Sequence, residues 1–233
     1  PATEGDTLFV RTASTGYPSG TGYNPEIILY APDGITVLAQ DAQPQYGPVD
    51  INYTVSQTGD FLLTVQSQQA SWLGNYGIVA QKTNNPENAT TLLSGEPTAG
   101  TVDVPGGMET FTITSDGTDN ISIRLGASCE GGLILFDPEG TEIARSFSGD
   151  TYVAAEIDEL PPVAGEYTIL AGAGTSKTGN FGITAQYPAN GQHLPYGTQI
   201  ADSLDVQGAV NTYILPATEG DTLFVRTAST GYP

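Results

Sequence analysis

The stretch PEIILYAPDGITVLA, Pro25–Ala39, contains the pattern that decides the fold. Its β-branched and aromatic run, Glu26–Tyr30, favours a strand. The Ala-Pro-Asp-Gly that follows favours a turn, because proline presets φ and glycine accepts a positive φ. A second apolar run comes directly after the turn, so the stretch predicts a β-hairpin.

Runs of the same kind recur along the chain at even spacing, bounded by Gly, Pro, Asp and Asn. No window keeps the apolar stripe of an amphipathic helix, and the 29 glycines and 16 prolines disfavour helices further. The sequence therefore predicts an all-β protein of antiparallel β-sandwiches. The other predicted strands are Thr7–Thr12, Phe61–Val65, Tyr76–Ala80, Ile121–Leu125, Leu133–Phe136, Tyr167–Leu170 and Phe181–Ala185.

The same phrases return, in the same order, in the second half of the chain. The hairpin stretch Pro25–Ala39 corresponds to GGLILFDPEGTEIAR, Gly131–Arg145. GNYGIVAQ, Gly74–Gln81, likewise corresponds to GNFGITAQ, Gly179–Gln186. The repeat predicts one domain type in both halves.

The first half lacks the phrase with which the second half opens. That phrase is VDVPGGMETFTI, Val102–Ile113, and its counterpart LDVQGAVNTYIL, Leu204–Leu215, stands far from the first half. PATEGDTLFVRTASTGYP follows as residues 216–233 and is identical to residues 1–18, so the pattern has a period of 215 residues. The first domain is therefore expected to lack its opening strands.

These matches predict an organisation in five parts, with an open sheet edge in the first sandwich that invites pairing. Residues 1–82 form a first sandwich without its opening strands, residues 83–92 a linker, residues 93–187 a second and complete sandwich, residues 188–196 a linker, and residues 197–233 the opening strands of a further copy of the first sandwich.

Two assemblies would fill the open edge, and both make a head-to-tail polymer. The chain is either one window of a longer array of 215-residue repeats, or a subunit that donates its strand to the next subunit. The repeated eighteen residues favour the array, because a window longer than one period ends on its own beginning. The residues predicted to complete a neighbouring sandwich are Leu204, Val206, Val210, Tyr213 and Leu215.

The order of these phrases resembles the bacterial pre-peptidase C-terminal (PPC) domain family. The match is carried by Tyr213–Asp221 continuing through Thr222–Arg226, Leu29–Asp41, Tyr53–Ser67 and Gly74–Gln81. The resemblance implies an exported, jelly-roll-like sandwich, appended to a protease or arrayed in tandem, with a binding or stabilising role. The 233 residues themselves contain no protease domain, so we expect the binding or structural role.

Composition narrows the classes of partner. A formal charge of −20, from 26 acidic and 6 basic side chains, would repel nucleic acid and anionic membranes, and no apolar run is long enough to insert into a bilayer. The single cysteine, Cys129, predicts a buried apolar side chain, with a thiol that bridges two chains as the alternative. Sequons at Asn52, Asn88 and Asn120 are compatible with export.

The sequence contains no recognisable catalytic motif. Its one histidine, His193, lies in a Pro/Gly-rich linker, and it has no nucleophile elbow, zinc-protease motif or phosphate-binding loop. We therefore expect no enzyme, no catalytic residue and no required cofactor.

Two kinds of ligand suit the sequence. Calcium prefers carboxylate oxygens such as those in the acidic turns, whose alternative role is simply to be solvated. Glycans suit exposed aromatic faces, whose alternative role is packing. The candidate calcium ligands are Asp33, Asp41, Asp119 and Asp150, and the candidate carbohydrate residues are Trp72 and Tyr23.

The repeat within the chain favours a structural function over a catalytic one. We expect a structural subunit or repeat unit of an extracellular or cell-surface filament, whose main partner is the chain itself. The alternative is a cell-surface adhesin or a module that binds glycans or proteins.

Overall fold

The computed structural model describes residues 1–14, 24–42, 47–71, 73–187 and 190–229. Within these ranges the regular elements are β-strands and no α-helix occurs, so the all-β fold predicted from the sequence is confirmed. None of the described residues belongs to a helix of the length and apolarity that a membrane span requires.

The first sandwich consists of two three-stranded antiparallel sheets, β4-β1-β6 and β3-β2-β5. Its core lies between them and contains Val10, Ile27, Leu29, Val49 and Ile51. The strands are β1 (Thr7–Ser14), β2 (Pro25–Tyr30), β3 (Val37–Ala42), β4 (Val49–Thr54), β5 (Leu62–Ser67) and β6 (Tyr76–Lys82).

The second sandwich is larger, with sheets ordered β13-β10-β15-β8 and β12-β11-β14-β9-β7. Its core contains twenty buried residues, Cys129 among them, as the sequence predicts. The strands are β7 (Thr90–Thr91), β8 (Thr98–Val102), β9 (Met108–Ser115), β10 (Ile121–Ala127), β11 (Gly131–Phe136), β12 (Glu142–Phe147), β13 (Ala155–Glu159), β14 (Gly165–Ala173) and β15 (Gly179–Gln186).

Strands β1 to β6 correspond in order and pairing to β10 to β15. In both hairpins a turn closes on the predicted glycine: Gly34 N donates to Ala31 O and Gly140 N donates to Asp137 O, each at 2.9 Å. Both hairpins also shift register at the same place, between Leu29 and Tyr30 and between the corresponding residues of β11. The strands β7, β8 and β9 have no counterpart among the described residues of the first sandwich.

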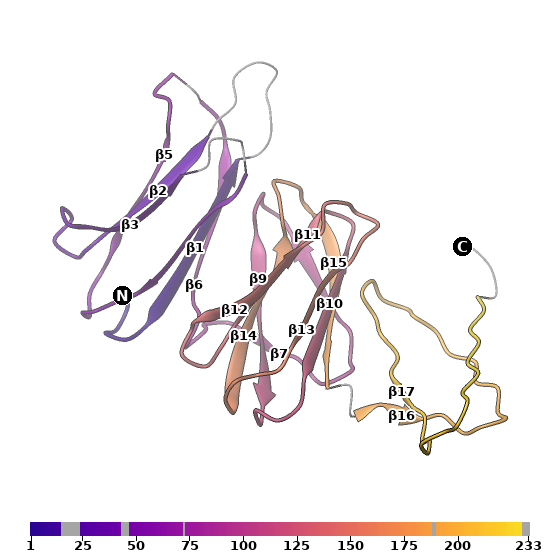
Figure 1. The fold of residues 1–233 in the computed structure, drawn as a ribbon. Helices are drawn as coiled ribbons and strands as arrows, with labels where there is room; N and C mark the ends of the chain where they lie inside the picture. Colours follow the sequence, from indigo (N-terminus) through magenta and orange to yellow (C-terminus); the bar gives the residue numbers. More distant parts are fainter. Residues whose placement is uncertain (15–23, 43–46, 72, 188–189, 230–233) are drawn as a thin grey trace.

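The predicted linkers and tail differ in detail from the structure. Thr90–Thr91, inside the predicted linker 83–92, pairs with β9, and Leu92 lies in the core of the second sandwich. In the tail, residues 190–229, the strands are short: β16 (Gln192–His193) pairs in parallel with β17 (Tyr213–Ile214). Longer opening strands need neighbours to pair with, and the tail extends beyond the second sandwich (Figure 1).

Candidate functional site at the joints between sandwiches

The first joint, where the β4-β1-β6 sheet packs on the β12-β11-β14-β9 sheet, has an apolar centre. Alternation along β1 points Val10 into its own core and Phe9 and Arg11 toward the neighbouring sandwich, as the sequence predicts for the two faces. The rings of Phe9 and Phe136 meet edge to face, 5.7 Å between centroids. The centre consists of Phe9, Met108, Ile134, Phe136 and Leu170.

A charged group lies beside this centre. Arg11 and Arg145 both bind Asp50, at N–O distances of 3.3 and 3.2 Å, and both guanidinium groups lie over the ring of Phe147. Arg11 also donates to the carbonyl of Gly174 at 3.0 Å. Burial lowers the pKa of Arg11 and raises the pKa of Asp50, while the opposite charges act in the other direction. The joint therefore holds a carboxylate between two cations contributed by two sandwiches.

Replacing Asp50 by asparagine should destabilise the protein by about 3 kcal/mol, because Arg11 would remain buried without its counter-charge. Glu156 is the matched control: it pairs with Arg124 at the corresponding strand position in the second sandwich. Its side chain is 51% exposed, against 16% for Asp50, so Glu156→Gln should cost less than about 1 kcal/mol. Urea denaturation measures both, and equal losses would contradict a special role for Asp50.

The hairpin tip of the second sandwich completes the first joint. Thr83 Oγ1 donates to Gly140 O at 3.0 Å, and Thr7 Oγ1 donates to Glu139 O at 3.3 Å. The turn chemistry that closes the β11–β12 hairpin thus also supplies carbonyl oxygens that are fixed toward the first sandwich.

A second part of the first joint is a turn seated on small residues. The turn Val104–Gly107, closed by Gly107 N donating to Val104 O at 2.9 Å, lies against Ala13 and Gly77. A methyl group on Gly77 would lie 2.2 Å from the carbonyl oxygen of Pro105. Glycine at this position of β6 is therefore required by the close approach of another backbone.

Two hydrogen bonds accompany this turn. Gln81 Nε2 donates to Thr110 Oγ1 at 2.9 Å, which joins β6 of the first sandwich to β9 of the second. Within the second sandwich, Leu92 N donates to Thr112 O at 2.8 Å, next to the parallel pair of β7 with β9.

The same turn contact occurs again between the second sandwich and the tail, at the second joint. The turn Val206–Ala209, closed by Ala209 N donating to Val206 O at 3.1 Å, lies against Gly126 and Gly182. These are the counterparts of Ala13 and Gly77. A methyl group on Gly182 would lie 1.9 Å from the carbonyl oxygen of Gln207.

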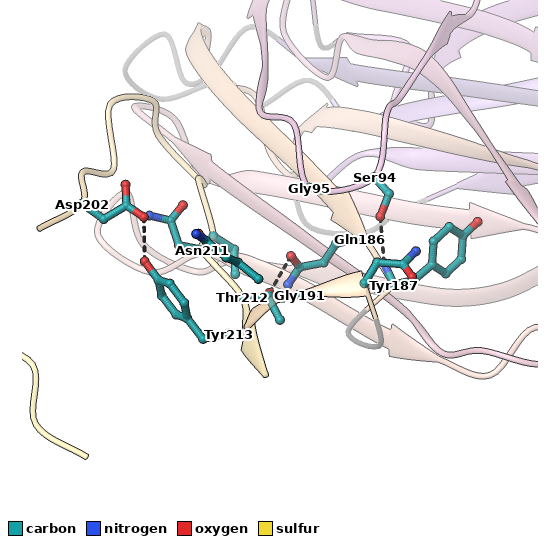
Figure 2. Close-up of a pocket in the computed structure, with 12 residues that line it drawn as sticks. Ser94, Gly95, Gln186, Tyr187, Gly191, Asp202, Asn211, Thr212 and Tyr213 are labelled. Atoms are coloured by element: carbon teal, nitrogen blue, oxygen red, sulfur yellow. Dashed lines mark hydrogen bonds between the residues drawn. The ribbon is translucent and has the colours of Figure 1, made fainter. Parts of the chain in front are cut away.

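The hydrogen bonds recur as well. Thr212 Oγ1 donates to Gln186 Oε1 at 2.7 Å (Figure 2). Thr212 and Gln186 are the counterparts of Thr110 and Gln81, between which the amide of Gln81 is the donor. The parallel pair β16–β17 reproduces β7–β9, and Leu194 N donates to Ile214 O at 2.9 Å where Leu92 donates to Thr112. The docked turn and the parallel strand pair of the tail therefore repeat those with which the second sandwich meets the first.

A small polar pocket, about 190 Å³, lies at the second joint (Figure 2). Tyr213 and Asp202, both from the tail, close one side through a 2.6 Å hydrogen bond, which lowers the pKa of Asp202 and raises that of Tyr213. On the other side Tyr187 N donates to Ser94 Oγ at 3.1 Å. The pocket therefore lies within the second joint, between the tail and the second sandwich.

The predicted interface residues all lie in the tail. Leu204 is exposed, and Val206, Val210, Tyr213 and Leu215 are half-buried. Val206 belongs to the docked turn. Their predicted role in completing a neighbouring sandwich stays a prediction.

The four predicted calcium ligands lie in separate turns and strand ends. Asp33 accepts from Ile35 N and Thr36 N within its own turn, and Asp41 accepts from Asp50 N. In the part of the chain that the structure describes, no group of three or more His, Cys, Asp or Glu side chains is placed to hold a metal. Calcium therefore stays a prediction without a site. Asp150 binds the backbone of Tyr152, Asp119 precedes β10, and Trp72 and Tyr23 lie outside the described residues.

The joints themselves were not identified from the sequence. Glycine inside the strands GNYGIVAQ and GNFGITAQ was the available signal, since an interior strand glycine often marks a close backbone approach. The signal does not say which segment approaches.

No protein-family model matches the chain, and no curated protein matches it. Among solved structures it is similar to the pre-peptidase C-terminal domain of collagenase from Bacillus anthracis, with 15% identity, 44% of this chain and 99% of that chain covered, and a TM-score of 0.36. It is also similar to the CBM22-1-CBM22-2 tandem domain of Paenibacillus barcinonensis Xyn10C, with 11% identity, 80% of each chain covered and a TM-score of 0.24. At these values the likenesses carry no argument about function.

Proposed function

We propose that the chain is a structural repeat unit of an extracellular filament in which β-sandwiches join head to tail. One observation carries the proposal: the docked turn, the Gln–Thr side-chain hydrogen bond and the short parallel strand pair of the first joint recur between the second sandwich and the tail. The tail carries the counterparts of the opening strands, so the second joint is the start of another sandwich.

The direction of the contact supports extension of the chain of sandwiches. Each joint sets a β1-type sheet face against the turn and strands that open the following sandwich, so the two sides of a joint differ. Such heterologous contacts extend into filaments when their rotation does not close a ring. Arrays of this kind gain stability from each unit and from each interface with the next.

The location outside the cell and membership of the PPC family are part of the proposal. They rest on the order of the sequence phrases and on the sequons, which are compatible with export. The adhesin or glycan-binding alternative depends on Trp72 and Tyr23, and no contact of the described residues favours it.

Light scattering after size exclusion and electron microscopy test the proposal on the purified chain. We expect linear oligomers that lengthen with protein concentration and show a regular axial spacing. Uniform monomers at high concentration would contradict a filament. Saturable binding on a glycan array, without oligomers, would favour the binding-module alternative.

A further inference from the structure

The interior of the first sandwich is open along the side where β5 and β6 end their sheets. Ile78 of β6 is 42% exposed, whereas its counterpart in the second sandwich, Ile183, is fully buried. Tyr76 is exposed in the same way, whereas its counterpart Phe181 is buried. The inward side chains of β5 are only half-buried, and their counterparts in β14 are fully buried; the half-buried residues are Leu63 and Val65.

The open side contains a hollow of about 390 Å³. Its wall includes residues of β1 and β6, the residue just before β5 and the chain's first residues: Leu8, Val10, Ala80, Phe61 and Ala2. Among the described residues, β6 pairs only with β1 and β5 only with β2. Apolar side chains that are exposed in the first sandwich but buried at the corresponding positions of the second indicate that the first sandwich has room for a further segment.

The second sandwich shows what fills this position. There β8 pairs with β15 and β9 pairs with β14. Together these two strands bury Val102, Phe111 and Ile113 in the core. The counterparts of these three residues are in the tail of the same chain and lie outside any core: Leu204, Tyr213 and Leu215.

Two independent observations give the same register for the missing strand. Phe111 lies opposite Ile169 in the β9–β14 pair, which sets Tyr213 opposite Leu63. The isolated bridge between Ala2 and Gly59 gives a second estimate. Ala217 repeats Ala2, so a donated strand would place Ala217 opposite Gly59. In an antiparallel pair, Tyr213, four residues before Ala217, would then lie opposite Leu63, four residues after Gly59.

We propose that residues Ile200–Leu215 of a second copy of this chain complete the first sandwich, in this register. The inference rests on the proposed function and specifies how one unit holds the next. The donated strand ends at Leu215. Beyond that residue the acceptor's own Ala2 already pairs with Gly59, which is the pairing that Ala217 of the donor would otherwise make. The acceptor's own β1 stays in place, since Phe9 and Arg11 are buried in the first joint.

The donor segment is already partly ordered. Its turn Val206–Ala209 is seated on Gly182, and Tyr213 pairs with Gln192 as Phe111 pairs with Thr90 in the complete sandwich. A preorganised segment loses less conformational entropy when it binds. The gain is the burial of apolar side chains on both partners, together with backbone hydrogen bonds along two strand edges.

Disulfide trapping between two singly substituted chains tests the inference. One chain carries Leu62→Cys and the other Ile214→Cys, the counterparts of Thr168 and Thr112, which lie opposite each other. Paired strands bring Cα atoms within the range of a disulfide, so the oxidised mixture should contain at least about tenfold more linked dimer than either chain alone. Buried Cys129 is present in every sample.

The matched control is Tyr213→Cys mixed with Leu62→Cys. A shift of one residue sends the side chain to the other face, so this pair should link weakly. If Tyr213→Cys and Ile214→Cys formed disulfides with Leu62→Cys in equal yield, the proposed register would be wrong. Regular filaments without linkage at 214 would overturn strand completion and leave the proposed function standing, whereas neither filaments nor linkage would overturn both. Circular dichroism confirms that each variant is folded.

Discussion

Replacing Phe9 by alanine should lower the free energy of unfolding by about 3–5 kcal/mol, whereas the same replacement at Phe224 should change it by less than about 0.5 kcal/mol. The two phenylalanines have the same neighbours in sequence, because residues 216–233 repeat residues 1–18. Their surroundings differ: Phe9 is fully buried in the first joint and Phe224 is 89% exposed.

The cost at Phe9 has two physical parts. Alanine removes apolar area from the contact with Phe136, Met108, Ile134 and Leu170, and it leaves a cavity between two sheets that are fixed by their own hydrogen bonds. Urea denaturation of the dilute, unassembled chain measures both variants. A loss at Phe224 as large as that at Phe9 would show that the tail is folded against a partner under those conditions.

The repeated eighteen residues show which part of the structure is local. The turn forms in both copies: Thr3 N donates to Asp6 Oδ2 at 2.9 Å, and Thr218 N donates to Asp221 Oδ2 at 2.8 Å. The strand that follows forms only as β1, between β4 and β6, whereas Thr222–Arg226 is not a strand. Turn chemistry is local and therefore predictable from a short window, but a strand needs neighbours.

Much of the fold could be predicted for this reason. Strong alternating runs such as Phe181–Ala185 and Pro-x-Gly turns predict hairpins, and the internal repeat predicts two similar sandwiches with the opening strands missing from one. The strands β4 and β13 and the part of the linker that joins the second core are not individually predicted. The two strands are short and carry several polar residues, so pairing with neighbours decides their structure.

The joints could be predicted only in part. The period of two along β1 separates Phe9 and Arg11 from Val10, but it does not say that both faces are covered. Asp50 is an unremarkable strand residue until Arg145 approaches from another sandwich. Contacts between residues far apart in sequence depend on how whole sheets stack, which no single window of sequence contains.

Replacing Gly182 by valine should weaken head-to-tail assembly roughly 10- to 100-fold, as expected for an overpacking cost of about 1–3 kcal/mol. The three atoms nearest to an added methyl group all belong to the tail, from Val206 and Gln207. Valine suits a strand such as β15, so the second sandwich itself should remain folded. The substitution therefore acts on the docked turn and leaves the sheet beneath it intact.

Gly149→Val is the matched control, because no atom lies within 4 Å of a methyl group at that position. On dilution, the oligomers measured by light scattering should dissociate at a much higher protein concentration for Gly182→Val than for Gly149→Val. The two variants should have similar melting temperatures. Limited proteolysis should also cut the tail faster in the first variant, because a turn released from Gly126 and Gly182 is open to the protease. Oligomers of normal size and a normally protected tail in Gly182→Val would contradict the second joint as the assembly contact, since valine cannot fit beneath a backbone carbonyl that stays in place.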